Sequence, residues 1–350
     1  MSVVGSYGSA AGLSGPLSRL VDDSASIKNR LDRITQQVAT GLVSQTYGGL
    51  GSRAQLSLDL RPQLARVDVF GQNITSAATR TDVSSQVLDQ MQQIASTFFS
   101  GTIGMTGQTS QEIDTMASQA SAALSQVRGL MNTKIGDTYL FAGQDSANEP
   151  LPATHFDAFV QSIKTAAGGL AATGGAATAA ATLAAAIATS PFSASLGSSR
   201  QSVLVGFGVS ASVGIVAGQD TFVSQTGANT TGSYVRDLIR SLATIASLNS
   251  GQTSLGASFT ALVDNTRTSL GQQIAVINNE SAGLGESKQL LGMNQTALTD
   301  TQQALTLQIS DVENVDAAAT AASLSEAQTQ LQISYKLISS MQNLSLVHFL

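Results

Sequence analysis

The second half of the chain carries a regular pattern of apolar residues. Starting at Val263, every seventh residue is apolar at eight successive sites: Val263, Leu270, Ile277, Leu284, Leu291, Leu298, Leu305 and Val312. This heptad repeat predicts one long amphipathic helix over about residues 256–310. The opposite positions are polar, as such a helix requires: Gln273, Glu280, Asn294, Thr301 and Gln308.

The first half contains apolar stripes that can pack against this helix. One stripe begins at Leu56, Leu60 and Leu64, and it continues through later positions: Val67, Ile74, Val87, Met91, Ile94 and Phe98. A second stripe follows a glycine-rich break: Ile113, Met116, Ala120, Val127, Met131 and Ile135. An antiparallel bundle would bury all these stripes together.

Both chain ends carry shorter amphipathic patterns. The N-terminal pattern is Ile27, Leu31, Ile34 and Val38, and the C-terminal pattern is Leu324, Ala327, Leu331, Ser334, Ile338 and Met341. Because each has one stripe to bury, we expect the two ends to pair. Their remaining positions are mostly Ser, Gln, Asn and Ala with little charge, which favours coverage by another subunit.

The middle of the chain differs from both halves. Residues 166–190 are rich in Ala, Gly and Thr and predict a helix between loops, whereas residues 200–225 alternate in the manner of strands. We therefore expect a mainly α fold, an elongated antiparallel helical bundle built from both ends, with a small β-rich or mixed insert. The expected divisions are 1–50 (export and assembly segment), 51–143 and 233–310 (the two bundle halves), 144–232 (insert) and 311–350 (assembly helix).

Composition narrows the possible partners. Charged residues make up 11% of the chain and the net charge is −6, which argues against nucleic acid. No apolar run is long enough to cross a membrane, and the N-terminus lacks the basic and apolar regions of a secretory signal. Cysteine is absent, so the fold has neither disulfides nor thiolate metal sites.

The candidate chemistry is sparse. The two histidines, His155 and His348, are far apart in sequence, and we interpret both as surface residues. The sequence contains no HExxH or GxSxG motif. We expect the acidic group Asp311, Glu313 and Asp316 to lie on a solvated helix face or near a helix start. We therefore predict no catalytic, cofactor-binding or metal site, and no enzyme.

The C-terminal stretch, residues 311–350, resembles the terminal region of the flagellin superfamily. The matching residues are Asp316, Leu324, Leu331, Ser334, Leu344, Ser345, Leu346 and Leu350. The N-terminal stretch is similar to the family's other end at Leu31, Ile34, Thr40 and Gly41, although YGGLGSR at 47–53 replaces the common acidic motif. Residues 136–146, GDTYLFAGQDS, resemble a signature of the hook-filament junction branch through Tyr139, Phe141 and Gly143.

This resemblance implies a flagellar structural protein outside the cell, exported without a cleaved signal peptide, with no cofactor. Implied partners are further copies in a ring or tube, another hook-associated protein, flagellin and an export chaperone. The assembly residues it implies are Ile27, Leu31, Ile34, Val38, Leu324, Leu331, Ile338, Met341, Leu344 and Leu346. Filament flagellin is the alternative in the same family, and a secreted helical adhesion or binding module is the alternative of another class.

Overall fold

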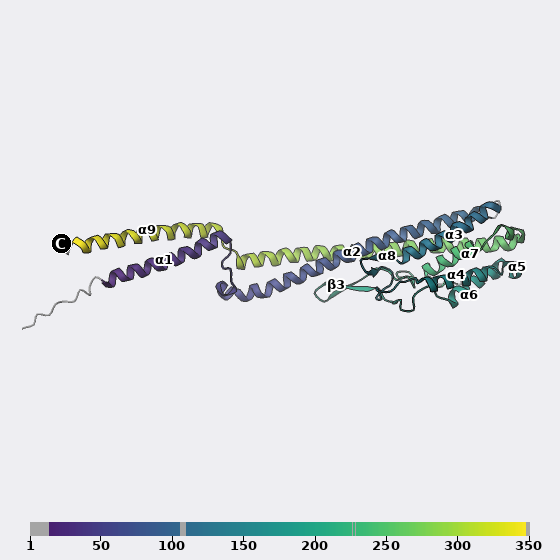
Figure 1. Ribbon diagram of the computed structural model, residues 1–350, viewed down its shortest axis with the longest axis horizontal. Coiled ribbons are helices and arrows are strands. Elements are labelled where there is room, and N and C mark those ends of the chain that lie inside the picture. Colours follow the sequence, from purple (N-terminus) through teal and green to yellow (C-terminus); the bar gives the residue numbers. More distant parts are fainter. Residues whose placement is uncertain (1–13, 106–109, 226, 228, 348–350) are drawn as a thin grey trace, which may run out of the picture. The chain divides into compact units, whose positions relative to one another are not determined.

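The computed structural model describes residues 14–105, 110–225, 227 and 229–347, and most of these are helical (Figure 1). The helices are α1 (Ser14–Thr40), η1 (Tyr47–Arg53, a 3-10 helix), α2 (Ala54–Gly104), α3 (Ser110–Met131), α4 (Ala153–Ala167), α5 (Leu170–Thr173), α6 (Gly175–Ala188), α7 (Tyr234–Ala246), η2 (Ser250–Leu255, a 3-10 helix), α8 (Ala257–Glu313) and α9 (Ala317–Val347). The mainly α prediction is confirmed.

The chain forms two compact units. The terminal unit comprises the described residues up to Val67 and from Asp300 onward, and the central unit comprises the described residues of 68–299. The long helices α2 and α8 each contribute to both units. Each unit is described by itself below.

In the terminal unit, α1 and α9 lie side by side in opposite directions (Figure 1). The first turns of α2 contact the last turn of α8 through the carboxylate of Glu313, which accepts hydrogen bonds from Ser57 and Arg61. The expected pairing of the two chain ends is therefore present within one chain.

The acidic group at the end of α8 departs in part from the expectation. Asp316 does lie at a helix start, because its carboxylate accepts hydrogen bonds from the backbone N–H groups of Ala318 and Ala319 at 2.9 and 3.1 Å. Glu313 is not on a solvated face, since it is only 8% exposed. The placement of Arg61 on the neighbouring helix α2 explains this burial, because the guanidinium supplies the partner that a buried carboxylate needs.

The central unit is a helical bundle in which α3, α7 and parts of α2 and α8 share one apolar core. Every member of the heptad stripe that begins at Val263 is at most 8% exposed, in both units. Burial of this stripe on α8 confirms the long helix predicted from the heptad repeat.

Two polar positions on the other face of α8 are also buried, contrary to a simple amphipathic pattern. Gln273 and Glu280 are both 0% exposed. The loop before α7 covers Glu280 and donates the backbone N–H groups of Thr221 and Phe222 to its carboxylate. On α2, Leu56 is 48% exposed while Ser57 is buried, so the stripe there is displaced by one residue.

The insert contains both helices and strands. Strands β3 (Gln201–Gly206) and β4 (Val209–Val213) form an antiparallel hairpin, with Gln201 paired to Val213. The helices α4 and α6 pack against each other, and both contact α7. A second, minimal hairpin is made by β1 (Lys134–Ile135) and β2 (Thr138–Tyr139). The strands expected within 200–225 are thus confirmed.

Candidate assembly interface

The predicted assembly residues on α1 and α9 meet along one seam between these helices. Ser24 on α1 and Ser334 on α9 are buried and share a hydrogen bond, which fixes the antiparallel register. At that register Ile27 lies level with Leu331, and Ile34 lies level with Leu324. The described seam residues of the prediction are Ile27, Leu31, Ile34, Leu324, Leu331, Ile338 and Met341, all of them buried or half-buried.

The other predicted assembly residues do not lie in this seam or cannot be placed in it. Val38 is 47% exposed, because the seam ends near the last turn of α1 and the side chain of Gln37 turns to the connector instead. Leu344 and Leu346 lie outside the described side chains, and His348 lies outside the described residues. The seam therefore joins the two ends of one chain, and its use between chains stays a prediction.

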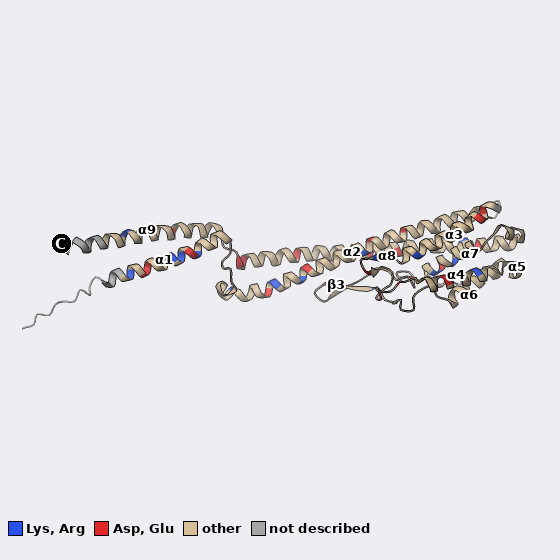
Figure 2. Ribbon diagram, viewed as in Figure 1, with Lys and Arg blue, Asp and Glu red and all other residues tan. Residues whose placement is uncertain are grey.

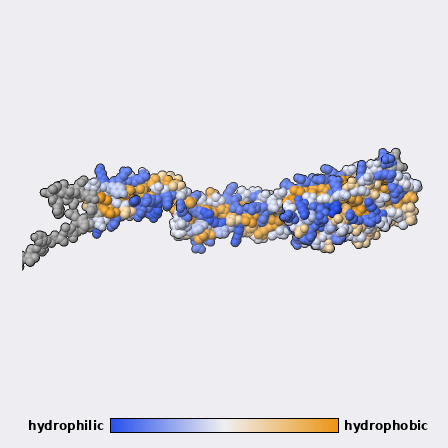
Figure 3. Space-filling model, in the orientation of Figure 1, coloured by the Kyte–Doolittle hydropathy of each residue, from blue (hydrophilic) through white to orange (hydrophobic). Residues whose placement is uncertain are grey.

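Apolar side chains are also exposed on the outer faces of this pair. Val21 on α1 and Ile333, Tyr335 and Leu337 on α9 are each at least half exposed. On the face seen in Figure 3, hydrophobic residues alternate with hydrophilic ones along both helices. A further surface that covered these side chains would stabilise the resulting assembly, because burial of apolar area is favourable by about 25 cal/mol per Å².

Charge is distributed unequally between the two helices (Figure 2). Along α9 the charged residues are Glu326 and Lys336, as the low-charge expectation requires. The expectation is wrong for α1, which carries seven: Arg19, Asp22, Asp23, Lys28, Arg30, Asp32 and Arg33. The prediction of low charge followed the apolar and small residues of α1. The charged residues lie on either side of that apolar stripe.

A short connector ties the two ends of the chain together. After α1, Gly41 adopts φ +71°, which favours glycine, and its backbone carbonyl accepts a hydrogen bond from Val315 at 2.9 Å. The N–H of Val43 donates to the carbonyl of Glu313 at 2.7 Å. These bonds join the exit of α1 to the entry of α9.

Electrostatics strengthen the same connection. The hydrogen bond from Arg61 holds the pKa of Glu313 below its usual range, with Ser57 and the charge of Arg61 acting in the same direction. The Glu313 carboxylate is therefore ionised under all mildly acidic and neutral conditions. It fastens α2 to the α8–α9 junction while that charge persists.

The family-motif residues lie in the central unit. Phe141 is fully buried, and its carbonyl accepts a hydrogen bond from Ala217 at 3.0 Å. Gly143 has φ +65°, and a Cβ there would lie 2.8 Å from the carbonyl oxygen of Ser199. These two residues fasten the bundle to the loops of the insert, which accounts for a Phe and a Gly at these places.

Tyr139 occupies the edge of the same motif. Its hydroxyl donates to Glu149 at 3.2 Å, and the ammonium of Lys134 lies 4.3 Å from the centre of its ring. The motif is thus a structural junction between bundle and insert.

The remaining candidates of the sequence are one histidine, metal ligands and a membrane span. Nδ1 of His155 lies 3.0 Å from the carbonyl oxygen of Phe192, which is a structural hydrogen bond. Within the described ranges, no three His, Asp or Glu side chains gather where they could hold a metal ion. Among the same residues, no helix combines the length and the hydropathy of a membrane span.

Comparison with known protein families supports the resemblance seen in the sequence. Residues 267–350 match the bacterial flagellin C-terminal helical region, and this range includes most of α8 and all of α9. This part of the chain is therefore similar to the C-terminal region of bacterial flagellins. A search of curated proteins found no match to this chain.

A solved structure shares the fold. It is assigned as a flagellar hook-associated protein of Vibrio parahaemolyticus, and it aligns with a TM-score of 0.55 over 77% of this chain and 99% of that chain. The two sequences are 12% identical, so the likeness concerns the fold. The C-terminal match and this shared fold are both similarities to flagellar proteins.

Proposed function

We propose that this protein is an adaptor between the flagellar hook and the filament, assembled through its terminal helices. The observation that carries the proposal is the antiparallel pair α1–α9, which joins the two chain ends and still exposes apolar residues on its outer faces. The fold shared with a chain assigned as hook-associated is in keeping with this proposal.

The mechanism proposed for assembly uses the division into two units. The central unit has its own apolar core and folds without neighbours. The terminal pair buries one narrow seam and needs the cover of further copies to become stable. Copies then form a ring or tube, and their partners are another hook-associated protein on one side and flagellin on the other. Export without a cleaved signal, with the help of a chaperone, belongs to the same proposal, and no catalytic activity is part of it.

Filament flagellin is the second candidate, because the matched C-terminal region is common to flagellins. The two roles differ in what their loss does to the flagellum. A strain without the adaptor should bear bare hooks and release unassembled flagellin into the medium. A strain without its filament protein should instead lack flagellin altogether.

Deletion of the gene, followed by electron microscopy and immunoblotting of the medium, separates these cases. Bare hooks together with released flagellin support the adaptor. Normal filaments in the deletion strain would contradict both flagellar roles and would favour a secreted binding module. Complementation with Leu331→Asp, which places a charge in the seam, should fail to restore filaments. The matched control is Gln332→Asp, which adds the same charge at the exposed neighbouring position and should restore them.

A further inference from the structure

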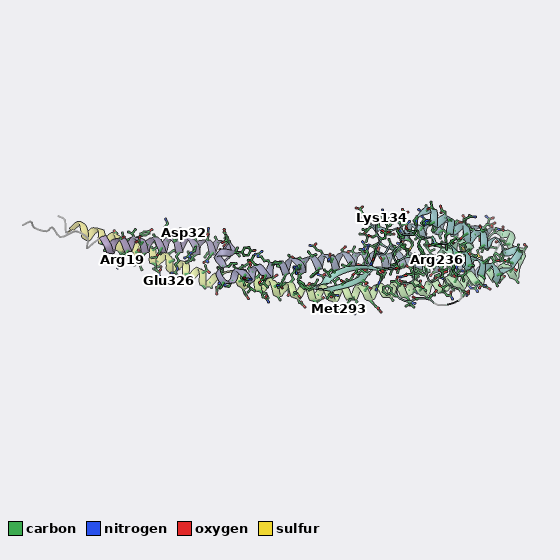
Figure 4. All side chains as sticks on the ribbon, turned by 90° about the horizontal axis from the view of Figure 1, so that it is seen from below. Arg19, Asp32, Lys134, Arg236, Met293 and Glu326 are labelled. Atoms are coloured by element: carbon green, nitrogen blue, oxygen red, sulfur yellow. The ribbon has the colours of Figure 1, made fainter. Side chains whose placement is uncertain are left out.

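One flank of α1 carries a charged stripe that the seam does not use. The stripe consists of Arg19, Asp22, Asp23, Arg30 and Arg33, all of them exposed. At 3.6 residues per turn, these five positions fall within an arc of about 100°. Figure 2 shows blue and red residues on α1 where α9 is almost entirely tan, and Figure 4 labels Arg19 on α1. The stripe is therefore a distinct surface of the terminal pair.

The charges in the stripe are sorted along the helix. The carboxylates of Asp22 and Asp23 form an acidic pair, and Arg30 and Arg33 form a basic pair about 14 Å further along at 1.5 Å per residue. Within the described part of the chain, none of these four side chains forms an ion pair. Asp23 and Arg30 are separated by two helical turns, which is too far for contact within one helix.

The surface beside the basic pair is hollowed by the connector. Arg33 lines a hollow of about 440 Å³ next to Leu42 and Val43. Arg30, Arg53 and Asp316 line another of about 400 Å³, which also borders Val43 and lies next to the start of α9. Both hollows are large enough for side chains from another molecule, and three arginines and one aspartate line them. The charge of the lining is therefore net positive, which favours carboxylates.

We infer that the acidic pair Asp22–Asp23 of one copy docks against the basic pair Arg30–Arg33 of a second copy. This chain carries both halves of the contact on one stripe, so a second copy supplies the complementary charge. We place the two copies parallel and offset by about 14 Å along α1, so that the acidic pair of one meets the basic pair of the next. The contact is then heterologous and can repeat from copy to copy into a ring or helix. The inference rests on the proposed function, for which it names a contact between neighbouring subunits.

The absence of cysteine allows a direct test of this contact. Two full-length single variants, Asp23→Cys and Arg30→Cys, are mixed and oxidised at a concentration where sedimentation shows oligomers of the natural chain. A disulfide needs Cα atoms about 4.4–6.8 Å apart, so the bond reports contact between copies. We expect a disulfide-linked heterodimer that is lost when oligomers are formed at 1 M salt, where the Debye length is about 3 Å.

The control mixture pairs Asp23→Cys with Lys28→Cys. Lys28 is also exposed on α1, but it lies on the other flank, so we expect no heterodimer. Equal cross-linking in the control, or oligomers without the Asp23–Arg30 bond, would overturn the inference while leaving the adaptor role intact. A chain that stays monomeric would overturn it as well. A homodimer through Ser26→Cys alone would indicate a closed two-fold contact and would contradict a repeating one.

Exchange of the charges between the acidic and the basic pair gives a second test, which is measured as complementation of the deletion strain. Arg30→Asp with Arg33→Asp should abolish complementation of the deletion strain, and so should Asp22→Arg with Asp23→Arg. The chain with all four changes restores opposite charges across the contact and should regain filaments. Failure of the fourfold variant, although it is exported and folded, would argue against this pairing. A deletion strain with normal filaments would instead refute the proposed function, and the cross-link would still be tested on purified protein.

Discussion

The central and terminal units bury their apolar side chains to different depths. In the central unit, large side chains such as Tyr234, Phe141 and Phe159 are almost completely removed from solvent. In the terminal pair, the best-buried apolar side chains are Ile34 and Ala327, and most of the seam is only half-buried. A helix with one main neighbour can cover only one stripe, whereas a bundle covers each helix on several sides. Stability in the terminal pair must therefore depend more on partners.

The largest difference between the units should be in the free energy of unfolding that is lost when one apolar side chain in each unit is truncated. Phe141→Ala removes a fully buried ring and should lower the free energy of unfolding by about 3–5 kcal/mol. Leu331→Ala removes a half-buried side chain from the seam and should cost only about 1 kcal/mol in the monomer. Urea unfolding followed by circular dichroism measures the first, and hydrogen exchange in α1 and α9 measures the second. Equal losses would mean that the terminal pair is as well packed as the central unit.

Substitution of two glycines in α8 by alanine should give a second and smaller difference in stability. The ring of Phe222 occupies the space beside Gly283, where a Cβ would lie 2.2 Å from a ring carbon, so Gly283→Ala should cost about 1–3 kcal/mol. Gly285 has open space beside it, and Gly285→Ala should stabilise the helix by about 0.4–1 kcal/mol. Thermal unfolding of both variants checks the opposite signs. Destabilisation by both would show that α8 tolerates no added side chain in this region.

The two buried glutamates of α8 should respond to pH in opposite directions. Burial raises the pKa of Glu280, despite the N–H groups of Thr221 and Phe222, and nearby Asp220 adds to this effect. Its contribution to stability is therefore complete below the unfolded value of 4.5 and is lost as the pH rises through the folded pKa. The pKa of Glu313 is lowered, so its contribution is present above 4.5 and is lost as the pH falls through the folded pKa.

Hydrogen exchange at several pH values can follow both sites in one protein. Acidification to about pH 4 should increase protection of the Thr221–Phe222 loop and decrease protection at the α8–α9 junction. Glu280→Gln should remove the pH dependence of protection only at the Thr221–Phe222 loop. The loop itself should stay in place, because the amide oxygen can still accept the two N–H groups. Glu313→Gln should remove the pH dependence of protection only at the α8–α9 junction. Parallel responses at both sites would contradict the assigned directions.

The sequence predicted the helical part of the fold well because periodicity reports burial directly. The heptad stripe from Val263 to Val312 is buried at every site, and the strands within 200–225 are present. The pattern could not show that Gln273 and Glu280 are buried, because their cover comes from a loop distant in sequence. For the same reason the sequence does not indicate that Glu313 pairs with Arg61, which lies 252 residues away.

The candidate interface was predicted only in part. Periodicity identified the seam residues but could not distinguish pairing within one chain from pairing between chains, since both bury the same stripe. The apolar positions of α1 do not indicate the charged stripe beside them. Its sorted signs, Asp22 and Asp23 followed by Arg30 and Arg33, were visible in the sequence. What the sequence could not show was the hollow that the connector leaves beside the arginines.

The smallest expected effect concerns the last apolar position of α1. Val38 follows the heptad spacing of Ile27, Leu31 and Ile34, yet it is 47% exposed while Ile34 is 7% exposed. Val38→Ser should therefore change the stability of the monomer by no more than about 0.5 kcal/mol, as an exposed substitution does. Ile34→Ser, the matched change four residues earlier, should cost about 2 kcal/mol or more because it buries a hydroxyl beside the seam.

The same two variants show whether an apolar residue of α1 stabilises the monomer or contacts another subunit. If Val38→Ser leaves hydrogen exchange of the monomer unchanged but weakens complementation of the deletion strain, then Val38 is covered by another subunit, as the sequence pattern predicted. If both stability and complementation are unchanged, Val38 has no part in assembly, and the interface is confined to other surfaces of the terminal pair. Loss of monomer stability equal to that of Ile34→Ser would show that the seam continues to the end of α1.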